Sequence, residues 1–556
     1  MKKFFWISAL FLLSAGIALL ILARYAEHVA EPYILTFLEH NKPGHHKIEY
    51  GKIRLNLLNS TVNIRDVRVF PEPEYSGNEN VWMVLNVGLI KLKRIDLWEL
   101  FFHKNLYISD FIILRPETRL HLPDRITSQS VENVTAEEDV QVKPQLLKSI
   151  ALDKMIISGG TFRLYRNEDI IASSDNIGFL ARNISLVKNT DDDPLGYSYG
   201  EVKFILTDLW FQSETGLYDM GLDKFTVVKK DSSVILEGFR MKPKYGREEF
   251  SKQLKSQDDR FDIDIGKIEV AGIGYRRFLE GNPLEITRIM IDGMTADIYR
   301  DKNVPFDLMN YPEYYNELFL KLSIPLQINA VEIDNSRLIY SELATGAAQA
   351  GEIIFEDFKL VSYKLNNRPV NDSVEDFIQI NVKAKIMGEG PLNADLVLPL
   401  EGNTRAIRCS GSVGAMKVVP LNGMLEPSIN IKFNDGLLTR MTFAFEGDER
   451  LSNGWMEFLY KDLNVAILKK EPGKEWGFLS MLANTVTLSN NPHSGKDPKI
   501  VAIGYERDRN KGVINFIWKT IQSGMIRTII PVNKYQINKK QKEVRVPEGK
   551  ASKKKK

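Results

Sequence analysis

Apolar and polar residues alternate with a period of two through most of this chain of 556 residues. Successive side chains of a β-strand point to opposite faces, so the alternation predicts strands with one buried face. The clearest run places five apolar residues between Gln379, Asn381, Lys383 and Lys385: Ile378, Ile380, Val382, Ala384 and Ile386. A further run contains Ile429, Ile431 and Phe433, and Gly, Asn and Asp separate such runs. We therefore predict a mainly β fold of antiparallel strands.

A degenerate repeat recurs within this β pattern. Three segments have the order apolar strand, turn, strand and tyrosine: Met155–Tyr165, Ile289–Tyr299 and Val331–Tyr340. Ile112–Leu122 and Ile268–Tyr275 are looser copies. True repeats would predict a sheet that is extended by the addition of similar units. An ordinary antiparallel meander would give similar segments without any repeat.

The N-terminal segment differs from the rest of the chain. Phe4–Ala23 is an uncharged run of 20 residues. As a helix it would cover ~30 Å, the hydrocarbon thickness of a bilayer. Lys2 and Lys3 before the run and Arg24 after it favour a cytoplasmic N-terminus and a translocated remainder. A cleaved signal peptide is the alternative, but the run is long and no good cleavage site follows it. We expect an uncleaved transmembrane anchor.

The sequence divides into five predicted regions. They are a transmembrane anchor (1–23), a juxtamembrane helix (24–42), a repetitive β-rich region (43–409), a C-terminal β region (410–533) and a lysine-rich, disordered tail (534–556). The C-terminal β region is predicted to end in an amphipathic helix within Asn510–Pro531, where apolar residues recur at helical spacing. Phe516 and Trp518 of this helix could contact a membrane.

Three segments interrupt the β pattern. Tyr245–Arg260 and Phe306–Leu322 have the spacing of short helices or lids. Thr127–Pro144 is polar and acidic and is predicted to be a loop.

The charge distribution argues against a nucleic-acid-binding body. Residues 534–556 contain ten basic and two acidic residues, which leaves 64 basic against 70 acidic residues in 1–533. Nucleic-acid binding requires a basic surface, which this body does not offer. The tail could adhere to anionic lipid or acidic polymers, or be solvated without a partner. Cys409 is the only cysteine, so the chain has no internal disulfide.

Motifs for catalysis or metal binding are weak. Gly196–Gly200 matches G-x-S-x-G around Ser198, but a predicted strand follows it instead of the helix of a nucleophile elbow. Asp262 and Asp264 share one face of a predicted strand without further calcium ligands, which predicts a solvent-facing surface. The sequence has no phosphate loop or H-E-x-x-H spacing. We predict that the protein is not an enzyme and uses no cofactor or metal.

Two stretches of the chain share the arrangement of a known family. The N-terminal stretch comprises Tyr50–Val69 and Val84–Leu122, with a Leu-rich turn at Ile95–Phe102, a strand at Ile108–Leu114 and then Pro116. The C-terminal stretch comprises Ser410–Pro427, Tyr460–Leu468 and Ile514–Met525. In these features the chain resembles the AsmA-like envelope proteins of Gram-negative bacteria.

The resemblance implies a fold, a location and a function. The fold would be an elongated, curved β-groove, open along one side and apolar inside. The protein would be anchored in the inner membrane with its body in the periplasm. It would bind phospholipid and help to move it between the envelope membranes, supporting the outer membrane, with partner proteins in either membrane. The residues predicted to contact lipid are Ile378, Ile380, Val382, Ala384, Ile386, Ile429, Ile431 and Phe433.

Two other functions stay open at this point. The apolar faces could pack against each other in closed sandwiches, and the protein would then be an envelope scaffold or an assembly factor for outer-membrane proteins. A membrane-tethered hydrolase that uses Ser198 is the third alternative.

Overall fold

The computed structural model describes most of the chain after residue 45. The described residues are 46–56, 59–75, 81–96, 98–103, 105–123, 149–187, 196–198, 200–228, 232–279, 281–309, 311–368, 377–400, 407–470, 479–480 and 485–529. The predicted anchor (1–23), juxtamembrane helix (24–42), loop Thr127–Pro144 and tail (534–556) lie outside these residues. Among the helices that are described, none has the length and apolarity needed to span a bilayer.

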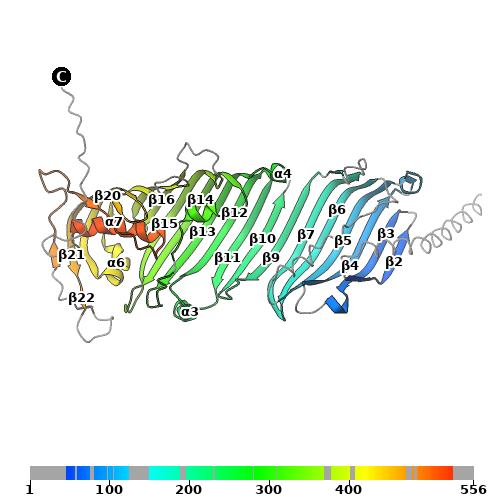
Figure 1. Ribbon diagram of the computed structural model, residues 1–556, viewed down its shortest axis with the longest axis horizontal. Helices are drawn as coiled ribbons and strands as arrows, with labels where there is room; N and C mark the ends of the chain where they lie inside the picture. The colour runs from blue at the N-terminus through cyan, green and yellow to red at the C-terminus, as the bar shows by residue number, and fades with distance from the viewer. Residues whose placement is uncertain are drawn as a thin grey trace, which may run out of the picture. The chain divides into compact units, whose positions relative to one another are not determined.

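The fold is mainly β, as the alternating pattern predicts (Figure 1). The chain divides into two compact units. The first comprises Met1–Gly216 and Met220–Glu237, and the second comprises Leu217–Asp219 and Gly238–Lys556. The strands β10 (Tyr218–Val228) and β11 (Ser233–Pro243) contribute residues to both units. The predicted boundary at residue 409 stays a prediction.

The first unit is built on one mixed sheet. Its strands are β1 (His46–Glu49), β2 (Lys52–Asn56), β3 (Thr61–Pro71), β4 (Trp82–Ile95), β5 (Asn105–Leu122), β6 (Ser149–Arg166), β7 (Asp169–Val187), β8 (Gly196–Ser198) and β9 (Val202–Gln212). Two short helical turns, η1 (Pro73–Tyr75) and η2 (Glu99–His103), interrupt them. β3, β4, β5, β6, β7 and β9 are neighbours in that order, and only the β5–β6 pair among them is parallel.

The second unit is also built on a mixed sheet. Its strands are β12 (Asp259–Ile273), β13 (Leu284–Asp301), β14 (Leu326–Leu343), β15 (Gly351–Asn366), β16 (Phe377–Ile386), β17 (Gly390–Pro399), β18 (Ile407–Val413), β19 (Met416–Lys417), β20 (Ile431–Gly447), β21 (Ser452–Ile467), β24 (Thr485–Thr487) and β25 (Ile500–Ile503), with the separate pair β22 (Lys469–Lys470) and β23 (Leu479–Ser480). The β13–β14 pair is parallel, whereas the neighbouring strands from β14 through β15, β16, β17, β18, β20 and β21 to β25 pair antiparallel. The sequence predicted antiparallel strands. It did not reveal that β5–β6 and β13–β14 are parallel pairs.

The predicted repeats are not strand–turn–strand units. Met155–Tyr165 lies within β6, Ile289–Tyr299 within β13 and Val331–Tyr340 within β14, and each of these strands is continuous. In place of a turn, each segment contains one residue with positive φ: Gly159, Gly293 or Asn335. A single left-handed residue bends and twists a strand without reversing it. At Gly159 and at Asn335 the register with the next strand shifts, as in a β-bulge.

The helices of the second unit partly match the prediction. They are α3 (Arg247–Gln253), α4 (Tyr275–Leu279), α5 (Tyr315–Leu320), η3 (Val419–Leu421), α6 (Asn422–Ile429) and α7 (Val513–Ile529). α3, α5 and α7 lie in the three segments that were predicted to be helical, whereas α4 and α6 were not predicted.

The strand predicted at Ile429 is wrong. Ile429 is the last residue of α6, and Asn430 follows it with φ +57°. A left-handed residue at this position ends a helix, so the strand β20 begins only at Ile431.

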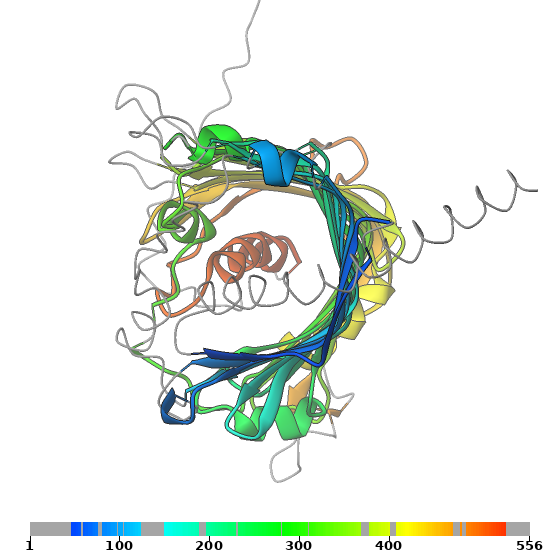
Figure 2. The ribbon, with the colours of Figure 1, turned by 90° about the vertical axis from the view of Figure 1, so that its right-hand side faces the viewer.

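Helix α7 lies on the concave side of the second unit's sheet (Figure 2). It packs against β21 and β25. A Cβ atom added to Gly524 would lie 2.5 Å from Ile503 Cγ2 and 2.6 Å from Met456 Sδ, so only glycine permits this close approach. Phe516 is likewise packed onto Gly447. Met456, Ile503 and Phe516 therefore mark the concave face as apolar.

Candidate functional site

An apolar strip crosses the strands of the first unit on one face of its sheet. Cross-strand partners follow one another through β2, β3, β4, β5, β6, β7 and β9 in the order Ile53, Ile64, Ile90, Ile113, Ile157, Phe179 and Phe204. A second row on the same face follows Leu55, Val62, Leu92, Phe111, Met155, Ala181 and Val202. We call these two rows the first-unit strip.

A similar strip crosses the second unit. It consists of cross-strand partners on neighbouring strands from β12 to β25, in the order Ile268, Ile291, Ile333, Leu360, Val382, Ala394, Gly411, Phe443, Met456 and Val501. We call this row the second-unit strip. Because Met456 contacts α7, the strip lies on the concave face.

Burial increases along the second-unit strip toward α7. Phe443 and Met456 are 3% and 0% exposed and belong to a packed cluster that includes Ile529 of α7. At the other end, five residues are only partly buried: Ile268, Ile291, Ile333, Leu360 and Val382. Within the described part of the chain, none of these five belongs to a packed hydrophobic cluster. The strip is thus closed by α7 at one end and partly open at the other.

The residues predicted to contact lipid are divided between packed and open parts of this face. Ile378 belongs to a buried cluster with Phe516, and Ile380 packs against it. Ile431 and Phe433 are buried in the cluster around Met456, and Ile386 and Ile429 pack against that cluster. Ala384 is 6% exposed, so its side chain has little free surface. Among the residues predicted to contact lipid, Val382 therefore has the position that best suits contact with a bound ligand.

The two predicted membrane contacts also differ. Phe516 is 2% exposed and packs between α7 and the sheet, so it is a core residue in this structure. Trp518 of the same helix is partly buried.

The opposite face of each sheet carries ion pairs, together with some apolar residues such as Ile112, Ile156 and Leu180. In the first unit, Arg94 pairs with Asp110 at 3.1 Å, and Arg182 pairs with Glu201 at 3.1 Å. In the second unit, Lys242 Nζ lies 2.7 Å from Asp262 and 2.5 Å from Asp264. The two aspartates thus bind a lysine on the surface, as expected for a solvent-facing pair. Ion-paired side chains on this face are typical of a sheet surface in contact with water.

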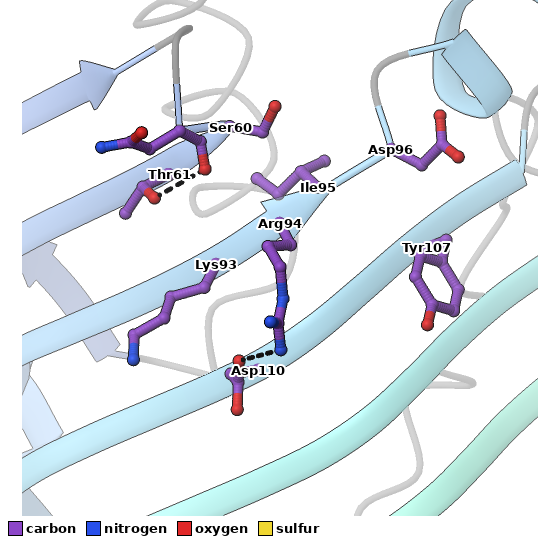
Figure 3. A pocket seen from close by; sticks show the side chains of 9 residues that line it. Ser60, Thr61, Lys93, Arg94, Ile95, Asp96, Tyr107 and Asp110 are labelled. Atoms are coloured by element: carbon purple, nitrogen blue, oxygen red, sulfur yellow. Dashed lines mark hydrogen bonds and ion pairs between the residues drawn. The ribbon is translucent and has the colours of Figure 1, made fainter.

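A polar hollow of about 790 Å³ lies at the β3–β5 region of the first unit (Figure 3). Lys93, Arg94, Asp96, Tyr107 and Asp110 contribute to its lining. Arg94 donates to Ser109 Oγ at 2.6 Å and to Asp110 at 3.1 Å, and Tyr107 donates to Asp153. Its lining has two basic residues, Lys93 and Arg94, and two acidic residues, Asp96 and Asp110, so the hollow is polar and carries no excess of one charge.

Metal ligands and the G-x-S-x-G segment are the two weak motifs of the sequence, and the part of the chain that the structure describes bears on both. Groups of three or more His, Cys, Asp or Glu residues that could hold a metal do not occur there. Within the G-x-S-x-G segment, Gly196–Ser198 forms β8, which pairs with β7, and the next described element is strand β9. A nucleophile elbow needs a helix at that point.

Cys409 gives a test of how tightly the α7 end of the concave face is packed. Burial raises the pKa of the Cys409 thiol to about 12. At pH 8 the native thiolate fraction is then on the order of a thousandfold below that of an unfolded chain, whose thiol pKa is ~8.5. We expect a disulfide reagent to modify Cys409 only after denaturant is added. Rapid reaction of the native protein would contradict this packing.

Comparisons with known proteins do not add a relative. No protein-family model matches this chain, and no curated protein matches it.

Sequence reasoning missed the open half of the second-unit strip. Ile268, Ile291 and Ile333 lie in segments recognised as repeats, but nothing in the sequence aligns them with Leu360 and Val382. The signal that could have found them is the pairing register, which depends on the bulges and on the parallel β13–β14 pair.

Proposed function

We propose that this protein binds phospholipid along its apolar strips and helps to move it between the membranes of a cell envelope. The observation that supports this most directly is the open half of the second-unit strip, where Ile268, Ile291, Ile333, Leu360 and Val382 keep part of their surface exposed. Contiguous exposed apolar surface is unfavourable in water and marks binding sites. Acyl chains would cover it, and each buried CH₂ group would contribute ~0.8 kcal/mol.

The dimensions of the strips suit an acyl chain. Seven neighbouring strands contribute to the first-unit strip, and at ~4.8 Å between strands it is ~29 Å long. One leaflet of a bilayer has a hydrocarbon thickness of ~15 Å. A chain lying across the strands would thus find apolar contacts along its whole length.

The resemblance to AsmA-like proteins supplies the cellular setting of the proposal. In that setting Phe4–Ala23 anchors the protein in the inner membrane, and the body lies in the periplasm. The left-handed residues in the long strands, such as Gly159 and Gly293, suit the curved groove that the family implies. The proposed role is binding and transfer, so it requires no catalytic residue or cofactor.

The test is to purify the full chain in a neutral glycoside detergent and to measure retained lipid by native mass spectrometry and by extraction. We expect at least about one phospholipid per chain, because detergent should replace the lipid that covers the apolar strips only slowly. A well-folded chain that retains no phospholipid would contradict the proposal. It would favour the alternative, an envelope scaffold or assembly factor for outer-membrane proteins without a lipid conduit.

A further inference from the structure

The connection from β13 to β14 spans residues 302–325, and its described residues 302–309 and 311–325 pack on the N-terminal half of α7 and the segment before it. Because β13 and β14 are parallel, this connection must return from one end of the strands to the other. Asn510 donates to the Leu308 carbonyl at 2.8 Å, and the Arg507 guanidinium lies 4.1 Å from the centre of the Tyr314 ring. Tyr314 shares a buried cluster with Phe516. The connection and the sheet thus enclose this half of α7 from two sides.

Three lysines belong to the elements that pack together here. Lys302 begins the connection, Lys511 precedes α7 and Lys519 is in its second turn. Lys511 Nζ lies 5.1 Å from the centre of the Phe306 ring, which places it against the same connection. Burial lowers the pKa of Lys519, and the positive charges of Lys302 and Lys511 lower it further, against the opposing effect of Glu342.

The carboxylates around this site already have partners. Glu342, 9% exposed, pairs with Lys302 and accepts a hydrogen bond from the Tyr340 hydroxyl at 3.0 Å. Asp259 accepts two hydrogen bonds from Arg300, at 2.6 and 2.7 Å. Asp508 lies 3.9 Å from Lys511. Each of these three acids is therefore paired with a base other than Lys519.

Lys519 is the cation of this site that lacks an acidic partner. Its Nζ donates to Gln522 Oε1 at 2.8 Å, and within the described ranges no carboxylate lies within ion-pair distance of it. A partly buried ammonium group that is paired only with a neutral amide and faces other cations is unfavourable. An anion at this position would remove that cost by accepting charge-assisted hydrogen bonds.

We propose that Lys519, with Lys302 and Lys511 beside it, binds the phosphate of a phospholipid whose acyl chains lie on the second-unit strip. This inference rests on the proposed function and names the part of the lipid that is recognised. Ile380, beside Val382 on β16, packs against the cluster that contains Phe516, and Ile517 of α7 packs against the same cluster. Lys519 follows these two residues on α7, so we place the headgroup at the α7 end of the apolar face, with its chains extending toward Val382 and Leu360.

The experiment compares two lipids with the same acyl chains. The full chain in dodecyl maltoside is mixed with equal amounts of dioleoyl phosphatidylglycerol and dioleoylglycerol, and native mass spectrometry counts each lipid retained. The wild type is expected to prefer the phosphatidylglycerol. Lys519→Gln, which can keep the contact with Gln522, is expected to lower the ratio of the two lipids about tenfold, the size of one charge-assisted hydrogen bond.

Two variants serve as controls. Lys496→Gln removes an exposed lysine elsewhere in the second unit and should leave the ratio unchanged. Lys519→Arg retains the charge and should retain the preference. A thermal unfolding curve for each variant shows that it is folded.

The outcomes separate this inference from the proposed function. If the wild type retains neither lipid, the proposed function itself fails. If it retains both equally, and Lys519→Gln leaves the ratio unchanged, lipid binding stands and the headgroup site is wrong. Inorganic phosphate is the second probe. If phosphate raises the unfolding temperature of the wild type but not of Lys519→Gln, and no lipid preference is seen, the site binds free phosphate and the lipid assignment is overturned.

Discussion

The Val382→Asp variant of the full chain is expected to bind phospholipid on the second-unit strip at least about tenfold more weakly than the wild type does. Val382 belongs to the open half of the second-unit strip, between Leu360 and Ala394. An aspartate there would lose hydration on contact with acyl chains, and a penalty of only ~1.4 kcal/mol gives a tenfold loss of binding. Because Val382 is only partly buried and belongs to none of the packed clusters, the fold should tolerate the change. Native mass spectrometry of both proteins in the same detergent measures the retained lipid.

Lys383→Asp is the matched control for this prediction. Lys383 is the next residue of the same strand and is exposed on the opposite face. The control introduces the same side chain into β16 and should leave the retained lipid unchanged. If the two variants lose lipid equally, the loss comes from the strand and not from the strip. If neither loses lipid, the strip is not the binding surface.

Replacing Phe516 with alanine is expected to lower the free energy of unfolding by about 3–5 kcal/mol, the usual cost of removing a buried aromatic ring. The Phe516 ring is 2% exposed. It packs on Gly447 and in a cluster with Val513, Leu398 and Tyr314. Its loss would leave a cavity between α7, the sheet and the 302–325 connection. Denaturant unfolding followed by circular dichroism measures the change, and the reaction rate of Cys409 reports whether α7 has loosened.

Ile514→Ala provides the comparison on the same helix. Ile514 is 58% exposed, so its truncation should change the free energy of unfolding by less than about 0.5 kcal/mol. An equal loss of stability in the two variants would mean that packing of the ring does not determine the effect, and helix propensity could not explain the loss because alanine favours helix more than either residue. A Phe516→Ala protein as stable as the wild type would show that α7 is not packed into the concave face.

The sequence was most informative where one local pattern was sufficient. The alternation from Ile378 to Ile386 predicted a strand, and β16 occupies Phe377–Ile386. Helical spacing in Asn510–Pro531 predicted α7, which occupies Val513–Ile529. In both cases the spacing of apolar residues within one element is enough, because the element exposes one face to the core and the other to water.

Local patterns failed where a single residue changed the path of the backbone. Gly159, Gly293 and Asn335 looked like turns between short strands, yet each lies in one long strand. A left-handed residue can reverse a chain or merely bend it, and hydrogen bonds to the neighbouring strand select between the two. Asn430 had the opposite effect, because it ends a helix where the sequence suggested a strand.

The alternating pattern by itself determined which side chains share a face. That pattern placed Ile378, Ile380 and Val382 together and opposite Lys383, because side-chain direction in a strand follows from position alone. Only the tertiary structure decided that α7 packs over one end of this apolar face and leaves Leu360 and Val382 partly open. Tertiary structure alone also brought Lys302, Lys511 and Lys519 to one place. The physical reason is that exposure and charge clustering depend on contacts between segments up to about 200 residues apart, and no local spacing encodes such contacts.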